Sequence, residues 1–109
     1  MIDEKLSKAL DGFLEKWEGV IDRWYRSQYT NLTPPTLQSK KGKKYIKISK
    51  VKRNATGGSV EAFIDMSTGD IFKPASYSAP AKHARGNIFS DDNGMEAIDA
   101  EGDVRYLRG

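Results

Sequence analysis

The side chains best suited to bind a ligand gather in residues 73–89, KPASYSAPAKHARGNIF. This segment combines lysine, arginine, tyrosine and asparagine with the single histidine of the chain. Proteins bind single-stranded nucleic acid with such groups, because rings and guanidinium planes stack on bases, lysines contact phosphates and an amide reads a base edge. The segment therefore predicts a nucleic-acid-binding site made of Lys73, Tyr77, Lys82, His83, Arg85, Gly86 and Asn87.

Several of these residues also have a structural explanation, and the sequence leaves both explanations open. In the structural one, His83 is a hydrogen-bonded imidazole, Tyr77 is a lid over the core, and Arg85 forms a salt bridge with the acidic tail. Gly86 favours either a positive φ or the close approach of a ligand, because it has no Cβ.

A second candidate surface is the basic run of residues 40–53, KKGKKYIKISKVKR, which holds eight lysines or arginines and no acid. Residues 40–90 carry eleven basic and three acidic side chains, a balance of +8 against +3 for the whole chain. This excess predicts a polyanionic partner whose binding depends on salt. The alternative is that the lysines only keep an exposed strand edge from aggregating.

Few residues point to catalysis. The chain has no cysteine and one histidine, which excludes disulfides and thiolate sites and makes a transition-metal centre unexpected. Asp65 and Asp70 bracket a predicted turn, where capping of the turn amides is favoured over a catalytic carboxylate pair. We expect no enzymatic activity and no cofactor. Because no stretch approaches the roughly 18 apolar residues of a membrane span, we expect a cytoplasmic protein with no membrane partner.

Residues 1–28 are predicted to form an amphipathic helix, because their apolar side chains recur at steps of three and four. Trp17 and Trp24 on this stripe either complete the protein's own core, which is the favoured interpretation, or dock a partner protein. Two adjacent prolines and several small polar residues indicate a linker over residues 29–42. The apolar positions of the helix are Leu6, Leu10, Phe13, Leu14, Trp17, Val20, Ile21 and Trp24.

Residues 43–109 are predicted to form a small, strongly bent antiparallel sheet or barrel, since short apolar alternations are separated by turn residues. A bulge near Ser49 or Lys50 is expected, because Val51 is out of phase with the preceding isoleucines. Residues 74–81 are predicted to be a stiff connection, since proline donates no ladder hydrogen bond. The expected strands are KYIKISKV, SVEAFID and DIFK, then Met95 to Ile98 and Val104 to Leu107; NATGG and MSTG are the expected turns.

The sequence ARGNI at residues 84–88 resembles the second signature of the Sm/LSm-like RNA-binding proteins, which forms the turn between the last two strands. FIDMSTGDI resembles their first signature, in which an aspartate, here Asp65, ends the second strand. The longer string GDIFKPASYSAPAKHARGNIF also looks like uncharacterised small proteins of marine podoviruses and cyanophages. The resemblance implies a mostly β fold with an N-terminal α-helix, in which a five-stranded antiparallel Sm-like barrel occupies residues 43–109.

The resemblance also implies a function for a single Sm-like domain over residues 1–109. It implies binding of RNA or another single-stranded nucleic acid by a homo-oligomeric ring of about five to seven subunits, in the cytoplasm of an infected host cell. By position, Arg85 is implied as the stacking or hydrogen-bonding arginine, Gly86 as the turn glycine and Asn87 as the polar reader. The alternative function is an interaction protein that docks a host or virion protein through the Trp17/Trp24 helix or the barrel edge.

Overall fold

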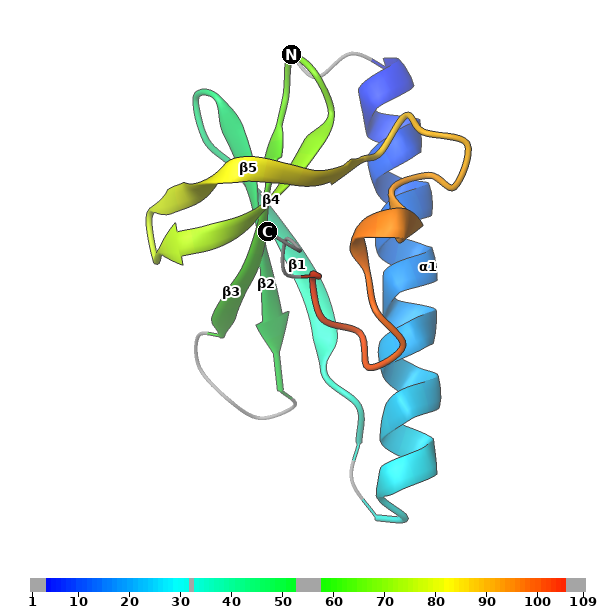
Figure 1. Cartoon of the computed structure of the whole chain (residues 1–109). Coiled ribbons are helices and arrows are strands. Elements are labelled where there is room, and N and C mark those ends of the chain that lie inside the picture. The colour runs from blue at the N-terminus through cyan, green and yellow to red at the C-terminus, as the bar shows by residue number, and fades with distance from the viewer. Residues whose placement is uncertain (1–3, 32, 53–57, 106–109) are drawn as a thin grey trace.

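A computed structural model describes residues 4–31, 33–52 and 58–105 of the chain. One long helix precedes five antiparallel strands, which pair in the order of the sequence (Figure 1). The elements are α1 (Glu4–Gln28), β1 (Thr36–Lys41), β2 (Tyr45–Val51), β3 (Ser59–Asp65), β4 (Asp70–Ser76), β5 (Ala79–Asn87) and the 3-10 helix η1 (Met95–Ala97). The helix followed by an antiparallel five-stranded sheet confirms the fold class expected from the sequence.

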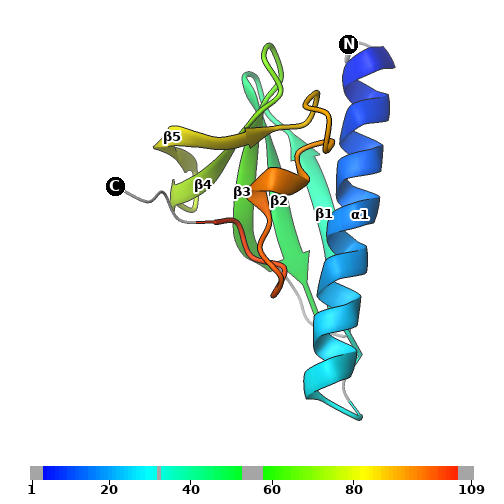
Figure 2. The ribbon, with the colours of Figure 1, turned by 45° about the vertical axis from the view of Figure 1, so that its right-hand side comes forward.

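The helix α1 packs one side against the rest of the protein. The segment that follows β5 lies between α1 and the sheet in both ribbon views (Figures 1 and 2). Trp17 is fully buried and its indole Nε1 donates to the Gly102 carbonyl over 2.7 Å, which fastens α1 to that segment. Full burial of a leucine, isoleucine or phenylalanine side chain contributes about 1.5–3 kcal/mol to the free energy of folding. The buried positions of α1 are Leu6, Leu10, Phe13, Trp17 and Ile21.

The sheet has two different faces. Ile46, Ile48, Ala62 and Ile64 point into the core shared with α1, whereas their neighbours along β2 and β3 point to the opposite face. The pairing of β2 with β3 does shift between Ile48 and Ser49, but the extra residue, Glu61, lies on β3. The expected bulge in β2 is therefore wrong, and Val51 stays on the face of Lys47 and Ser49 instead of returning to the core. In the described strands the sheet ends at β1 and β5, so closure into a barrel remains a prediction.

The linker expected over residues 29–42 is wrong for its second half, because β1 occupies Thr36–Lys41. The strand TLQSKK has one apolar side chain, Leu37, and its other residues are exposed, so it carries no alternating pattern to find. Pairing with β2 along all six residues holds it in place, and the Leu37 amide donates to Glu18 of α1 over 3.3 Å.

The stiff connection expected over residues 74–81 is also wrong, because β4 and β5 form a hairpin whose tip is Tyr77 and Ser78. Pro74 and Pro80 face each other across this hairpin. β4 pairs with β3 only around Ile71 and Phe72, so Pro74 lies beyond the point where β3 needs a backbone donor. Register shifts on both sides of Pro74 accommodate its missing N–H.

The strand expected from Met95 to Ile98 is wrong for its first three residues, which form η1. Gly94 has φ 86° and begins a short 3-10 turn, in which Ile98 N donates to Met95 O over 3.1 Å. Ile98 does pair with Val104, through an isolated antiparallel bridge. The remainder of that expected pair, residues 106–107, and most of the NATGG turn lie outside the described residues. No helix in the described ranges is long and apolar enough to cross a membrane.

Candidate nucleic-acid interface

The ARGN sequence lies at the end of β5 and does not form a turn between two strands, so that expectation is wrong. Gly86 is not among the residues with a positive φ. A Cβ on Gly86 would lie 3.0 Å from both the Ala97 Cβ and the Glu96 Oε2. The close approach that glycine permits is therefore made by the protein's own segment around η1 and not by a ligand.

Asn87 uses its side chain within the protein. Its Nδ2 donates to the Thr68 carbonyl over 2.8 Å and to the Asp70 carboxylate over 3.0 Å. Its Oδ1 accepts from the Phe89 amide over 2.7 Å. Both amide hydrogens are thus taken, and Asn87 ties the β3–β4 turn to the end of β5 instead of reading a base.

Two basic residues of the expected site hold the C-terminal segment. Lys73 Nζ donates to the Val104 carbonyl over 2.7 Å. Arg85 Nε donates to the Arg105 carbonyl over 3.0 Å, and Arg85 Nη1 donates to the His83 carbonyl. Arg85 does reach the tail, as the structural explanation expected, but it binds a carbonyl and not a carboxylate.

Asp65 caps the turn between β3 and β4, as the structural explanation expected. Its Oδ1 accepts from the Ser67 hydroxyl over 2.6 Å and from the amides of Ser67 and Thr68 over 2.8 Å and 3.3 Å. The Ser67 hydroxyl is the main reason that the pKa of Asp65 lies below its ordinary value; the two amides and the charge of Lys44 act in the same direction, against burial.

The other three expected site residues, Tyr77, Lys82 and His83, are exposed. The Tyr77 side chain is 72% exposed, so it is not a lid over the core. Its ring lies under the Lys47 ammonium, with 4.0 Å between Nζ and the ring centroid. This cation–π contact brings the tip of the β4–β5 hairpin to the basic run on β2.

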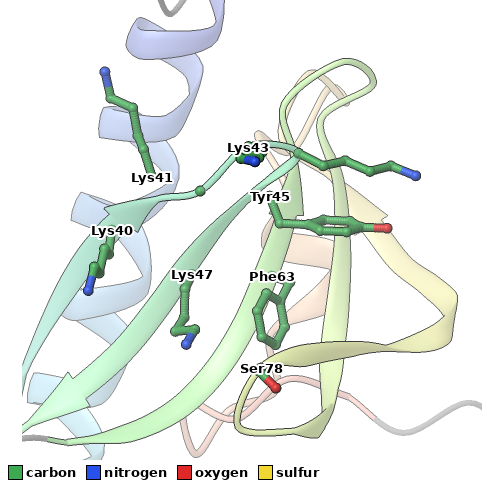
Figure 3. A pocket seen from close by; sticks show the side chains of 9 residues that line it. Lys40, Lys41, Lys43, Tyr45, Lys47, Phe63 and Ser78 are labelled. Atoms are coloured by element: carbon green, nitrogen blue, oxygen red, sulfur yellow. The ribbon is translucent and has the colours of Figure 1, made fainter.

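The basic run itself surrounds a hollow of about 260 Å³ on the face of the sheet opposite the core (Figure 3). We call it the basic hollow. Figure 3 shows Tyr45 and Phe63 next to each other below the β1–β2 turn, with Lys47 beside Phe63 and Lys43 at the turn, whereas Lys41 points away from the rings. The lining residues are Lys40, Lys41, Gly42, Lys43, Lys44, Tyr45, Lys47, Phe63 and Ser78.

Strand register assembles this hollow. Lys40 of β1 faces Lys47 of β2, Lys47 faces Phe63 of β3, and Phe63 faces Phe72 of β4. Residues paired across strands share one face of the sheet, so a lysine pair leads directly into an aromatic pair. The β1–β2 turn closes through a hydrogen bond of 2.8 Å from Gly42 N to Tyr45 O.

Two aromatic rings, Tyr45 and Phe63, line the basic hollow, and Phe72 packs against Tyr45 beside it. Tyr45 meets Phe63 and Phe72 edge to face, with centroid distances of 6.1 Å in both pairs. Phe63 is only 3% exposed, whereas Tyr45 is half-buried and presents part of its ring. Lys44 and Lys47 approach the rings of Tyr45 and Phe63 at 5.4 Å and 5.9 Å from their centroids.

The positive charge of the basic hollow is poorly neutralised. In the described ranges the ion pairs are Arg26 with Asp22 and Lys50 with Asp103, and neither includes a lining lysine. Among the residues that the structure describes, no acidic side chain lines the hollow. Like charges gathered at a concave surface raise the local concentration of anions.

Sequence reasoning identified the lysines but missed Tyr45, Phe63 and Phe72. The signal was present in the pairing of the two predicted strands KYIKISKV and SVEAFID. Aligning these strands as neighbours, with the isoleucines of both facing the core, places Tyr45, Lys47 and Phe63 together on the other face.

Of the two tryptophans expected to dock a partner in the alternative function, one is buried inside the protein. Trp17 is fully buried in the core, which confirms the favoured interpretation for that residue. Trp24 is half-buried and lies against Tyr25 and Tyr29, with centroid distances of 5.5 Å and 6.0 Å. Docking through a stripe that contains both tryptophans is therefore not available in this fold.

Fold and site together define a small helix-and-sheet protein with a lysine-rich, aromatic-floored hollow on the open face of its sheet. The chain belongs to a family of unknown function, DUF7717, whose model matches residues 2–107. Comparisons with curated proteins and with solved structures found no match. In the part of the chain that the structure describes, histidine and acidic side chains form no group of three or more that could hold a metal ion.

Proposed function

We propose that this protein binds single-stranded nucleic acid in the basic hollow. One observation carries the proposal: five lysines line the hollow together with the partly exposed ring of Tyr45, and none of the described lining residues is acidic. The lysines contact backbone phosphates, and the ring stacks on an unpaired base. Phe63 and Phe72 support Tyr45 from below and beside it, because their edge-to-face contacts fix the plane of its ring.

The aromatic floor favours a single strand over a duplex. A ring can stack on a base only where the base is unpaired, whereas lysines alone bind any polyanion. The basic hollow also differs from the site expected from the sequence, since it lies at the β1–β2 turn and takes only the tip of the β4–β5 hairpin from the segment of residues 73–89. Whether the strand is RNA or DNA is one outcome of the test below.

The test is the salt dependence of oligonucleotide binding, measured by fluorescence anisotropy with labelled RNA and DNA of equal length. The triple variant Lys40→Gln, Lys43→Gln, Lys44→Gln removes three lining charges. Its slope of log affinity against log salt should fall by about 0.7 for each lost phosphate contact, or roughly 2 for three. These lysines are exposed and make no ion pair in the described ranges, so the fold should be unaffected.

A matched control removes the same charge elsewhere. Lys8→Gln, Arg23→Gln and Lys82→Gln change three exposed cations that do not line the hollow. This control should keep most of the affinity and of the slope. Absence of salt-dependent binding, or equal losses in the two triple variants, overturns the proposal.

The homo-oligomeric ring implied by the resemblance remains a prediction. Its support is that β1 and β5 are the outer strands of the described sheet, and an unpaired strand edge is a common place for another subunit to add. Sedimentation or light scattering of the purified protein gives the mass directly. A monomer at all concentrations contradicts the ring without affecting the proposed binding in the basic hollow.

A further inference from the structure

A second hollow of about 370 Å³ adjoins the basic hollow. The two hollows share Lys40 and Lys47, which stand between them. We call the second one the polar hollow, because amide and hydroxyl groups replace most of the lysines in its lining. Its residues are Gln38, Ser39, Lys40, Lys47, Ser49, Val51, Gly58 and Tyr77.

The polar groups of this hollow are placed by the same register as the lysines. Gln38 faces Ser49 across β1 and β2, two residues along from the Lys40–Lys47 pair. Two residues of a strand span about 7 Å, and side chains two apart share a face. A pair of neutral hydrogen-bonding groups therefore lies beside a pair of cations on the same surface.

Gln38 and Ser49 have unused hydrogen-bonding capacity. In the described ranges neither side chain makes a hydrogen bond, although both line a concave surface. Gln38 offers two donors and an acceptor, and Ser49 offers one donor and an acceptor. This combination suits the edge of a nucleobase, which presents donors and acceptors side by side.

Tyr77 supplies a ring at the same place. The tip of the β4–β5 hairpin carries it to the polar hollow, where Lys47 lies over one face of the ring at 4.0 Å from the centroid. With 72% of the side chain exposed, the ring has surface left for a stacked base. The ammonium of Lys47 on the Tyr77 ring would also neutralise the negative charge of the backbone phosphate of a nucleotide stacked on that ring.

Resting on the proposed nucleic-acid binding, we propose that the polar hollow is a base-reading subsite for a single strand. One unpaired base stacks on Tyr77, and Gln38 and Ser49 hydrogen-bond its edge. Lys40 and Lys47 hold the phosphate between this nucleotide and the neighbouring one on Tyr45. The ligand is therefore a strand of at least two nucleotides, and its binding depends on base identity.

The test compares labelled homopolymers of adenine, cytosine and uracil or thymine, in RNA and DNA form, at one salt concentration. The wild-type protein should prefer one base by about tenfold, since a well-placed pair of base contacts discriminates by about 1–3 kcal/mol in protein–DNA complexes. The double variant Gln38→Leu, Ser49→Ala should lose this preference. It should keep the salt slope, because the lysines remain.

Tyr77→Ala should weaken all homopolymers by about 5- to 150-fold, the loss of one stacked base, whereas Tyr77→Phe should bind as the wild type does. A circular-dichroism melt of each variant confirms that it is folded. A wild-type protein without base preference, or a double variant that keeps the preference, overturns the subsite. If salt-dependent binding persists in either case, the proposed function stands. If no oligonucleotide binds at all, both proposals fall.

Discussion

Asn87 and Gln38 carry the same amide group, yet they do different work. Asn87 donates twice and accepts once within the protein, at the junction of the β3–β4 turn, β5 and the segment that follows. Gln38 lies on an outer strand and makes no side-chain hydrogen bond in the described ranges. Residue type favoured Asn87 as a binding group. The count of hydrogen-bond partners favours Gln38, because a group already satisfied has little to offer a ligand.

The same contrast holds for the regions around the two amides. Near Asn87, Glu96 accepts from the Asn87 backbone N–H over 3.0 Å and from the Ser90 hydroxyl over 2.7 Å. Burial raises the pKa of Glu96, but these hydrogen bonds outweigh it and leave the pKa below its ordinary value. Around the basic hollow, by contrast, lysines stand without ion pairs in the described ranges. Side chains of the first region contact other segments of the protein, whereas the lysines of the second region are the ones proposed to bind nucleic acid.

The largest expected effect that separates the regions is on stability. Asn87→Ala removes three side-chain hydrogen bonds and should lower the free energy of unfolding by about 2–4 kcal/mol, because its former partners lose their contacts as well. Urea denaturation measures this loss. The matched variant Gln38→Ala should change the free energy of unfolding by no more than about 0.5 kcal/mol. Equal losses in the two variants would contradict the division of labour between the amides.

A smaller effect is expected from acid. The pKa of Asp65 is lowered in the folded protein, chiefly by the Ser67 hydroxyl, so the folded state holds its proton less tightly than the unfolded chain does. Its contribution to stability is therefore present above the unfolded pKa of about 3.9 and is lost as pH falls through the lower folded value. Asp65→Asn should lower the free energy of unfolding by about 1–2 kcal/mol at neutral pH, where the charge-assisted hydrogen bonds are lost.

Urea denaturation at a series of pH values checks this prediction. The loss of stability between about pH 5 and pH 2 should be smaller in Asp65→Asn than in the wild type. Asp91→Asn is the control, because Asp91 is exposed and caps no turn through its side chain. An unchanged acid profile in Asp65→Asn would mean that other carboxylates set the pH dependence.

The sequence predicted the elements whose pattern is dictated by burial. The helix α1 and the strands β2 and β3 present apolar side chains at helical or alternating spacing. The bulge was placed on the wrong strand, because Val51 was assumed to be a core residue whereas it lies on the open face. The sequence did not predict β1, because its side chains show no alternating pattern and only its pairing with β2 makes it a strand. The β4–β5 hairpin escaped because its prolines occupy positions that β3 does not contact.

The candidate site was predictable only in part, for a related reason. Composition locates the basic run, which includes Tyr45, but Phe63 comes from β3, and only the register shows that the two rings meet. Conversely, Arg85 and Asn87 are suitable side chains by type, but contacts with distant segments take up their donors. No local pattern in ARGN reveals that the Arg105 and Thr68 carbonyls lie within reach.

The smallest expected effects concern Lys82 and His83, the exposed members of β5 that line neither hollow. Lys82→Ala, His83→Ala should change oligonucleotide affinity by less than about twofold at 0.15 M salt, because exposed charges beyond roughly 8 Å are largely screened there. Lys40→Ala, Lys47→Ala, measured on the same labelled strands, should weaken binding several times more. Because histidine counts as neutral at pH 7, the first pair removes one charge and the second removes two, so the single variants Lys82→Ala and Lys40→Ala, each of an exposed lysine, give the matched comparison. Equal losses of affinity in the Lys82/His83 and Lys40/Lys47 variants would mean that the interface extends along β5. Residue type would then be a better guide to the interface than the count of unsatisfied hydrogen-bonding groups.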